Sequence, residues 1–264
     1  MIRRLSYYDI PAAFHMSYAA GWNQTVEDWF RLLALEPDGC FGVEEDDRLV
    51  ATNTLLCYGR DLAWLGMVLT HPEFRRRGFA KQLLGTVLEL VEDRGIRCVK
   101  LDATEQGRCL YLKFGFRDEQ PIERWMRDPG PLKVVENSLR TGMPDSRLDC
   151  AAFGIDRGRF LATLGEAACL DDAYVMQRSG SRARYLGPCA AMTASSAKAA
   201  ISATIASRAE ETWFWDLLPK QAQAVTIARS LGFKPVRHLT RMVRGVPLSG
   251  ADKLVYATGG FEAG

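Results

Sequence analysis

The sequence predicts an α/β fold that occurs twice along the chain. Between Cys40 and Trp125, segments with the apolar pattern of strands alternate with segments of helical character. The stretch "LYLKFGFRDEQPIERWMRDPG" around Gly115 is then matched by "IARSLGFKPVRHLTRMVRGVP" around Gly232. In each, a helix ends in Gly-Phe and is followed by an Arg-rich strand. Two copies of one architecture follow from this repeat.

Composition limits the class of protein. The 264 residues are 47% hydrophobic, which suits one large domain or two of ordinary size. With 34 Lys and Arg against 32 Asp and Glu, the formal net charge is +2, too even for a protein whose main partner is nucleic acid or an anionic membrane. No apolar run approaches the ~18 residues of a membrane-spanning helix, and the first residues carry no export signal. We therefore expect a cytoplasmic protein.

The cysteines and histidines predict no metal site. The seven cysteines are odd in number, scattered and without CxxC pairs. This pattern favours free thiols in a reducing cytoplasm over disulfides or zinc. The three histidines also lack the spacing of metal ligands.

The first half of the chain reads as a strand–helix–strand series. "CFGVEEDDRLVATNTLLCYG" predicts two strands joined by a turn at Asp46 and Asp47, and "LAWLGMVL" predicts a central strand covered on both faces. Apolar residues then repeat at helical spacing from Ala80 to Val91, and Gly95 ends that helix. "RCVKLDA" predicts the next strand, parallel to the one before it, with a right-handed crossover.

A linker separates the two halves. The stretch "DPGPLKVVENSLRTGMPDS" contains three prolines and several turn formers. After it, "LGPCAAMTASSAKAAISATIA" takes the place of the apolar strand and its following helix, and "TWFWDL" takes the place of "CVKLDA". We therefore expect a domain at residues 1–128, a linker at 129–144 and a second domain at 145–264.

One strand-to-helix turn in the first half is unusually basic. Arg75, Arg76 and Arg77 stand where a helix begins, although the positive end of a helix dipole disfavours each cation by about 0.3–1 kcal/mol. The pattern Arg75-x-x-Gly78-x-Ala80 lets backbone amides point outward, and Gly78 permits close approach. The segment lacks the signatures of a P-loop and of a dinucleotide fold. A bound pyrophosphate explains the cations best.

These residues resemble the GNAT superfamily of acetyl-CoA-dependent N-acetyltransferases. "MVLTHPEFRRRGFAKQLL" matches the superfamily's pyrophosphate loop, Gln/Arg-x-x-Gly-x-Gly/Ala, and "LYLKFGF" matches its Leu-Tyr-x-x-x-Gly-Phe helix. With "GWNQTVEDW", "LDAT" and "AFGIDR", the resemblance extends over nearly the whole chain, toward bacterial two-lobed GNATs. It implies two GNAT-like lobes, the second degenerate. Each is expected to be a mixed, largely antiparallel twisted sheet with a central splayed parallel strand pair flanked by helices.

The resemblance implies acetyl-CoA as co-substrate. Pantetheine would lie between the splayed strands, and the pyrophosphate would rest on the amides of the arginine turn. Lys113 would reach the adenosine 3′-phosphate, and Thr104 stands where the superfamily commonly has Asn. The implied cofactor-binding residues are Met67, Val68, Leu69, Arg75, Arg76, Arg77, Gly78, Phe79, Ala80, Lys81, Thr104 and Lys113.

Acetyl transfer needs a neutral amine, a polarised thioester carbonyl and a proton for the departing thiolate. Tyr111, four residues before Gly115, matches the position of the superfamily's general acid. A phenol of pKa ~10 is protonated at neutral pH and can serve a thiolate of pKa ~8.5. A backbone N–H near Val68 would polarise the carbonyl. For the base, Asp102, Glu44 and His71 remain alternatives.

The segment before the first strand pair is where this superfamily places substrate-side helices. Aromatic and acidic side chains there can receive an amine by stacking and charge pairing. A helix merely pinned by two tryptophans is the structural alternative. The candidate substrate-binding residues are Trp22, Asn23, Gln24, Asp28 and Asp102.

We therefore expect an acetyl-CoA-dependent N-acetyltransferase that acts on a primary amine of a small molecule by direct transfer in a ternary complex. In the second half Ala228 takes the place of Tyr111 and "TASSAKAA" that of the arginine turn, so we expect one cofactor site per chain. The chain is expected to be a monomer or homodimer without nucleic-acid or membrane partners. A non-catalytic acyl-CoA sensor or interaction module is the alternative, and the charge balance argues against nucleic-acid binding through RRRG.

Overall fold

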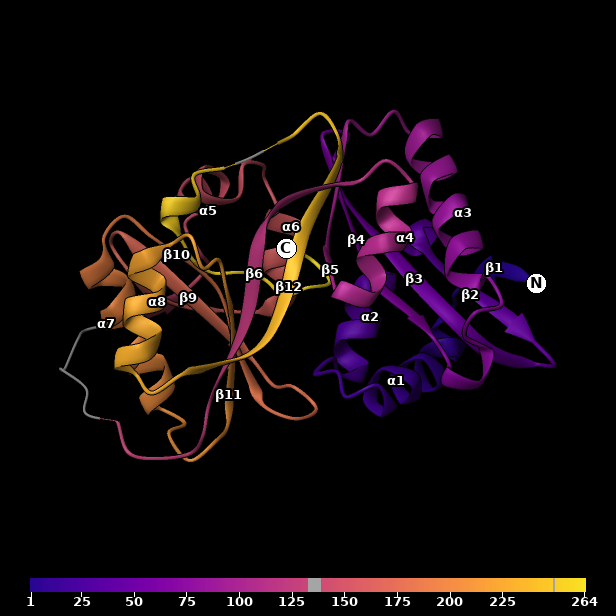
Figure 1. Ribbon diagram of the computed structural model, residues 1–264. Coiled ribbons are helices and arrows are strands. Elements are labelled where there is room, and N and C mark those ends of the chain that lie inside the picture. Colours follow the sequence, from indigo (N-terminus) through magenta and orange to yellow (C-terminus); the bar gives the residue numbers. More distant parts are fainter. Residues whose placement is uncertain (133–138, 249) are drawn as a thin grey trace.

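The computed structural model describes residues 1–132, 139–248 and 250–264. Its two lobes lie side by side, one built mainly from each half of the chain (Figure 1). The middle of the expected linker, residues 133–138, lies outside the described residues. None of the described helices is long and apolar enough to cross a membrane.

The first lobe contains the expected strand–helix–strand series. Asp46 and Asp47 both have positive φ and form the predicted turn between two of its strands. The strands are β1 (Ile2–Arg4), β2 (Cys40–Glu45), β3 (Arg48–Tyr58), β4 (Leu62–Thr70), β5 (Cys98–Ala103) and β6 (Arg117–Arg127). The helices are α1 (Ile10–Ala19), α2 (Val26–Leu35), α3 (Phe79–Asp93) and α4 (Glu105–Lys113), with 3-10 turns η1 (Tyr7–Asp9), η2 (Pro37–Gly39) and η3 (Pro72–Phe74).

The second lobe repeats this architecture. Its strands are β7 (Arg140–Gly142), β8 (Ala167–Leu170), β9 (Ala173–Arg178), β10 (Arg184–Ala191), β11 (Trp213–Leu217), β12 (Lys234–Gly245) and β13 (Val255–Ala257). Its helices are α5 (Ser146–Phe153), α6 (Gly158–Leu164), α7 (Ala194–Ala206) and α8 (Ala222–Ser230), with a 3-10 turn η4 (Asp252–Leu254). The pair β10–β11 is parallel, as is β4–β5 in the first lobe. The predicted fold class is therefore confirmed.

The two lobes exchange strands β6 and β12. Within the described ranges, thirteen strands form one sheet in the order β1-β2-β3-β4-β5-β12-β6-β11-β10-β9-β8-β7, and β13 pairs with β10. Strand β12 enters between β5 and β6 and is antiparallel to both, while β6 pairs with β11. Figure 1 shows β6 and β12 running together between the lobes. The division at residues 128 and 145 stays a prediction, and the sheet itself is continuous across it.

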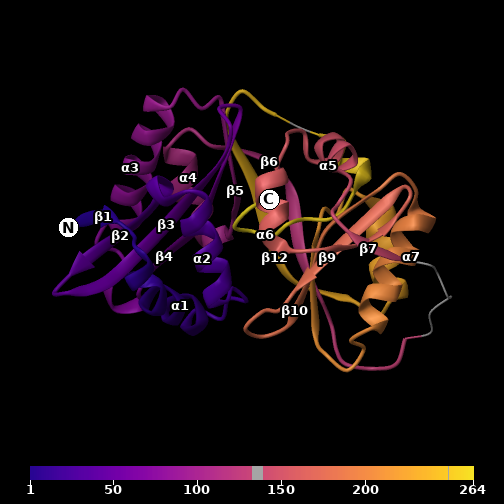
Figure 2. The same cartoon turned by 180° about the vertical axis from the view of Figure 1, so that it is seen from behind.

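Helices cover both faces of the first lobe's strands, α1 and α2 on one face and α3 and α4 on the other (Figure 2). Strand β3 shows why: the adjacent Leu55 and Leu56 are both buried, and each belongs to the core on a different face. Successive side chains of a strand point to opposite sides, so a run that is apolar throughout requires two covers.

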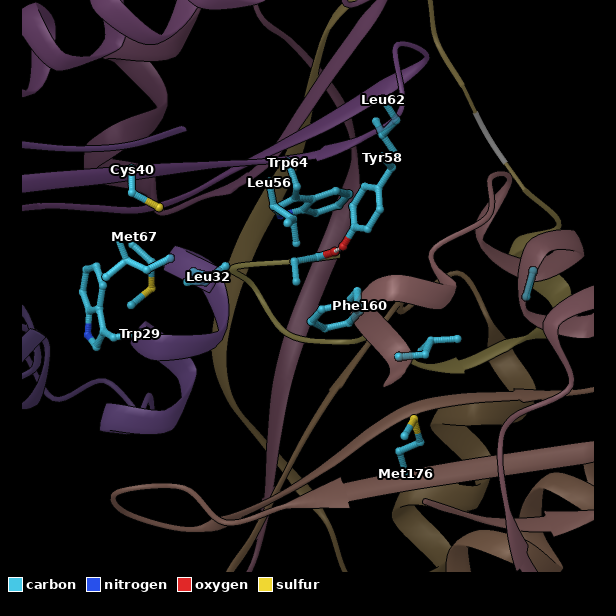
Figure 3. Close-up of a cluster of buried hydrophobic side chains, with 14 of the residues drawn as sticks. Trp29, Leu32, Cys40, Leu56, Tyr58, Leu62, Trp64, Met67, Phe160 and Met176 are labelled. Carbon is cyan, nitrogen blue, oxygen red and sulfur yellow. Dashed lines mark hydrogen bonds between the residues drawn. The ribbon is translucent and has the colours of Figure 1, made fainter. Parts of the chain in front are cut away.

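One cluster of buried side chains joins the lobes. Trp64 of β4 comes from the first lobe, and Phe160 of α6 and Met176 of β9 come from the second (Figure 3). The hydroxyl of Tyr58 donates to the carbonyl of Ala263 at 2.7 Å within the same cluster. Full burial of one large apolar side chain stabilises by roughly 1.5–3 kcal/mol, so this shared core holds the lobes together.

Candidate active site

The parallel pair β4–β5 separates along its length. Ala63 is in register with Val99 and Trp64 with Lys100, and the rest of β4, as far as Thr70, has no described partner on β5. A cleft of about 580 Å³ opens at this point. Its walls include β4, the start of α3, the end of β5 and α4. The splayed strand pair expected from the sequence is thus present and open.

A bulge in β4 faces the cleft. Thr52 of β3 is paired with Leu69 and Thr54 with Gly66, so β4 carries one extra residue between these pairs. Met67 has a φ of 50°, and its carbonyl accepts a 2.8 Å hydrogen bond from the Thr52 hydroxyl. A non-glycine residue at positive φ is strained, and such strain is common at binding sites. The segment Met67–Leu69 therefore brings irregular backbone to the wall of the cleft.

The basic turn at the start of α3 forms the next part of the wall. Gly78 is the N-cap of α3, with a φ of 86° and no side chain to cap the helix. The first amides, from Phe79 to Lys81, consequently lack partners within the helix. Arg75, Arg76 and Lys81 line the cleft beside them. Free amides and cations at a helix N-terminus suit a phosphate group.

Two residues of the predicted cofactor site lie elsewhere. Arg77 pairs with Glu45 at 2.8 Å, and its guanidinium carbon lies 4.8 Å from the centroid of the Phe74 ring. Arg77 and Lys113 are not among the described residues that line the cleft. The structure therefore does not bring these two side chains to the site, and both residues are exposed.

Tyr111 lies in the wall formed by α4. It is 8% exposed, and its ring packs edge-on against Phe116 with the centroids 5.9 Å apart. A Cβ on Gly107 would stand 3.2 Å from the Tyr111 ring, so glycine there gives the phenol its space. Burial raises the pKa of Tyr111, which keeps the hydroxyl protonated at neutral pH. Thr104 also lines the cleft, and its hydroxyl caps α4 by accepting from the Gly107 amide at 3.2 Å.

The facing wall is assembled from segments that are distant in sequence. It combines the loop before α2, the exchanged strands β6 and β12, and the segment after β13. Its residues are Trp22, Gln24, Arg124, Arg237, Leu239, Phe261 and Glu262.

Glu262 is a cleft carboxylate that sequence reasoning missed. It is 5% exposed, and it accepts hydrogen bonds from Arg178 at 2.7 Å and from the Gln24 amide at 2.8 Å. A Cβ on Gly66 would stand 2.9 Å from the Glu262 Cα, so the Glu262 segment packs directly on β4 beside the bulge. Burial raises the pKa of the Glu262 carboxyl. In sequence Glu262 lies 238 residues from Gln24 and belongs to no local motif.

Two of the predicted substrate residues hold the structure together. The Asn23 side chain accepts from the amides of Arg182 and Ala183 at 3.1 and 3.0 Å, and donates to the Ala183 carbonyl at 3.0 Å. Asp28 caps α2 and forms an ion pair with Arg178 at 3.3 Å. Neither residue is among the described residues lining the cleft. Their polar atoms are used in joining the lobes.

The three candidates for the base lie in different parts of the structure. Asp102 lines the cleft, but Arg241 holds its carboxylate in two hydrogen bonds of 2.8 and 3.0 Å. Glu44 pairs with Arg3 at 2.6 Å, and neither Glu44 nor His71 is among the described residues of the wall. No group of three His, Cys, Asp or Glu side chains that could hold a metal ion occurs in the described part of the chain.

Two family models match the chain, and both are of GNAT type. The model described as "Acetyltransferase (GNAT) family" matches residues 6–116, and the one described as "Acetyltransferase (GNAT) domain" matches residues 146–257. Together the two matches take in most of the sequence. A comparison with curated proteins found no match.

Solved structures show the same arrangement of two lobes. A protein of Pyrococcus horikoshii classed as an acetyltransferase is similar with a TM-score of 0.90 and 22% identity, over 100% of this chain and 95% of that one. A GCN5-related N-acetyltransferase from Sphaerobacter thermophilus has a TM-score of 0.67 and 14% identity, over 96% and 98%. A tandem GNAT protein from the clavulanic acid biosynthesis pathway has a TM-score of 0.66 and 15% identity, over 94% and 99%. At these identities the likenesses show the fold.

Proposed function

The chain belongs to the acetyltransferase (GNAT) family through both of its lobes, and on this premise we propose that its first lobe transfers an acetyl group from acetyl-CoA to a primary amine of a small molecule. The observation that carries the proposal is the shared cleft. A strand bulge, an uncapped helix N-terminus with cations, and a buried phenol all line it. These three features answer three separate needs of the reaction.

Binding of acetyl-CoA would use the first-lobe walls. Backbone groups at Met67, Val68 and Leu69 pair with pantetheine, and the amides at the start of α3 receive the pyrophosphate. Arg75, Arg76 and Lys81 add positive charge there. The fit is supported by Gly78, because an N-cap without a side chain leaves those amides free for a ligand.

Tyr111 acts as the general acid. The acceptor nitrogen attacks the thioester carbonyl carbon, the new C–N bond forms, and the C–S bond breaks. The thiolate takes the Tyr111 proton, and the nitrogen releases its second proton to solvent as the amide forms. A backbone N–H near Val68 stabilises the carbonyl oxygen during the attack. Because burial raises the pKa of Tyr111, the phenol carries this proton across the physiological range.

Glu262 acts as the base for the acceptor. An alkylamine of pKa ~10.4 is only ~0.1% neutral near pH 7.4, so a proton must be removed before attack. Asp102 accepts two hydrogen bonds from Arg241, and Glu262 accepts one each from Arg178 and Gln24, so both carboxylates are held. The choice of Glu262 rests on its position, since its segment lies against Gly66 beside the bulge. A carboxyl whose pKa is raised by burial is also a stronger base than an ordinary one. Glu262 passes the proton to solvent, and Tyr111 is reprotonated from solvent in turn.

Transfer is direct, within a ternary complex. No cysteine or serine occurs among the described residues that line the cleft, so the site offers neither thiol nor serine hydroxyl for a covalent acyl-enzyme. Two threonines, Thr70 and Thr104, also line it, and the Thr104 hydroxyl caps α4. The cofactor would bind against one wall of the cleft and the acceptor against the facing wall.

The cofactor site and the general acid fall to the first domain, residues 1–128, and the base comes from the second. Residues 145–264, joined by the linker at 129–144, contribute walls of the acceptor side through β12 and the Glu262 segment. In this domain α7 is capped by its own Thr193 hydroxyl, which accepts from the Ser196 amide at 3.2 Å. One of the amides at the helix N-terminus that would receive a pyrophosphate is therefore already used.

The test is an acceptor screen that detects free CoA. Amines, amino acids, polyamines, aminoglycosides and peptides are each offered with acetyl-CoA, and calorimetry measures acetyl-CoA binding in parallel. We expect binding together with CoA release for at least one class of primary amine. Binding without any release across the panel would instead identify a sensor and contradict the proposal.

A further inference from the structure

One guanidinium in the acceptor wall has no counter-ion. Arg237 of β12 lines the cleft and is half-buried, and among the described residues nothing forms a hydrogen bond or ion pair with it. Burial and the neighbouring Arg124 both lower the pKa of Arg237, whereas Asp216 raises it. A half-buried cation that faces a cleft without a partner is ready for an anion from outside the chain.

The other charges of this wall are already balanced. Arg124 donates two hydrogen bonds of 2.7 Å to Asp216. Arg241 holds Asp102, as described above. Arg178 donates to Glu262 at 2.7 Å and lies 3.3 Å from Asp28, which also pairs with Arg31. Among the described residues of this wall, Arg237 carries a charge that no neighbouring side chain balances.

The cross-strand pairing of Arg237 is locally unfavourable. Arg237 lies opposite Arg124 in the β12–β6 pair, and like charges at such positions are destabilising. The register shifts between Pro235 and Arg237, so a bulge stands immediately before Arg237. A bulge re-aims the side chains beside it. The exchanged strand thereby presents a cation to the cleft of the first lobe.

We propose that the acceptor carries a carboxylate as well as its amine, and that Arg237 binds this carboxylate. The inference rests on the proposed function, since it assumes an amine acceptor in this cleft. A single guanidinium balances a single negative charge, and its planar fork matches the two oxygens of a carboxylate. A phosphate monoester carries about −1.5 to −2 at neutral pH and would require a second free cation. Arg124 cannot supply it, because Asp216 already holds its charge.

The rest of the wall fits an amino acid or a related amine-bearing carboxylic acid. Glu262 and Gln24 would receive the amine, while Leu239, Phe261 and Trp22 present apolar surface for the carbon chain. The acceptor class is therefore defined by a carboxylate placed at Arg237 and an amine placed at Glu262 and Gln24.

The experiment compares matched acceptors that differ by the carboxylate alone. L-phenylalanine is paired with phenethylamine, L-leucine with isoamylamine, and 4-aminobutyrate with propylamine, and kcat/KM is measured for each with acetyl-CoA. Because hydrogen bonds to charged groups are strong, we expect the wild-type protein to prefer the carboxylate member of at least one pair by about 10–100-fold. Arg237→Gln should bring that ratio close to one, mainly through KM, and Arg237→Lys should keep part of it.

A matched control removes a similar charge from the same strand. Arg244 lies on β12 outside the described cleft wall and pairs with Glu92 at the surface. Arg244→Gln should keep the wild-type ratio. Equal ratios in wild type and Arg237→Gln, or a wild type without carboxylate preference, would overturn the inference. An Arg237-dependent preference for succinyl-CoA over acetyl-CoA, without any effect of the acceptor carboxylate, would place the anion on the donor and also overturn it.

A binding measurement separates this inference from the proposed function. Calorimetry with CoA present measures L-phenylalanine and 4-aminobutyrate binding to wild type and to Arg237→Gln. If no amine is acetylated but these acids bind in an Arg237-dependent manner, the carboxylate site stands and the acetyl transfer fails. If amines are acetylated and the acids bind wild type and variant equally, the transfer stands and the carboxylate site fails.

Discussion

Arg241 of β12 holds Asp102 of β5 through two hydrogen bonds, of 2.8 and 3.0 Å, between residues 139 positions apart. Both side chains are at least nine-tenths buried, so the pair ties the exchanged strand to the first lobe at the floor of the cleft. Asp102, a candidate substrate residue from the sequence, lines the cleft and also holds this strand in place.

Replacing Arg241 should destabilise the whole protein. Arg241→Met leaves the Asp102 carboxylate buried without its partner, and breaking such a pair costs about 3–5 kcal/mol. Urea unfolding followed by fluorescence measures the free energy. The double variant Asp102→Leu/Arg241→Met should recover most of the loss, and Arg244→Gln on the same strand should change stability by no more than about 0.5 kcal/mol. A loss below about 1 kcal/mol in Arg241→Met would show that the pair is solvated.

Gly78→Val should abolish CoA binding in a folded protein. Gly78 has a φ of 86°, which a β-branched residue adopts only with strain, so the turn changes and the amides of α3 are no longer aimed at the pyrophosphate. Calorimetry with CoA measures the affinity, and circular dichroism checks the fold. Gly85→Ala in the same helix is the control, since open space surrounds Gly85. The affinity of this variant for CoA should stay at the wild-type value. Unchanged CoA affinity in Gly78→Val would remove the loop from the cofactor site.

Tyr111→Phe should slow turnover while keeping acetyl-CoA affinity. Loss of a general acid reduces the rate by roughly 10²-fold, and the phenyl ring preserves the packing against Phe116 and Gly107. Initial rates and calorimetry on the same preparation separate the two effects. Tyr18→Phe, at an exposed position, is the matched control. Equal rates in wild type and Tyr111→Phe would mean that water or another group protonates the thiolate.

Glu262 should set the acid limb of the pH–rate profile. A base works when it is ionised, and burial raises the pKa of Glu262 above the usual carboxyl value of 4.5. As the pH falls through this raised pKa, Glu262 becomes protonated and kcat/KM drops, so the drop begins at a higher pH than an ordinary glutamate would give. In Glu262→Gln the residual kcat/KM should be low and should lack this limb. A limb of the same midpoint in both proteins would assign it to another group.

One acetyl-CoA should bind per chain. The N-terminus of α7 is capped by Thr193, whereas that of α3 has the side-chain-free Gly78, so the phosphate-binding amides are available in one lobe. Calorimetry should give a stoichiometry of one. Gly78→Val should abolish this single binding event, whereas with two sites it would remove only half of the calorimetric signal. Two binding events in the wild-type protein would assign a second cofactor site to the second lobe.

Local patterns in the sequence predicted the parts of the site that are themselves local. The turn around Gly78 and the placement of Tyr111 before Gly115 depend on neighbours a few residues away, and the structure brings both motifs to one cleft. The same patterns could not show side-chain direction. Arg76 has a φ of 64°, and within this twisted turn Arg75 and Arg76 face the cleft while Arg77 faces Glu45.

The acceptor wall could not be predicted, because it depends on which strands pair across the whole chain. The apolar alternation of β12 is the same whether that strand pairs within its own lobe or crosses to β5. Arg237 and Glu262 reach the first-lobe cleft only because of the crossing and of the packing of the Glu262 segment on Gly66. Neither position differs in sequence from an ordinary surface arginine or glutamate.

The strand exchange also sets an order of events during synthesis. The partner of β5 is made late, since Arg241 follows Asp102 by 139 residues. At about 5–20 residues per second, a ribosome needs on the order of ten seconds to add that length. Throughout this interval the nascent first lobe has an unpaired sheet edge at β5, and such edges invite pairing with other chains. Any delay in the folding of the first lobe would therefore shorten the time for which this edge stands exposed before the late strand arrives.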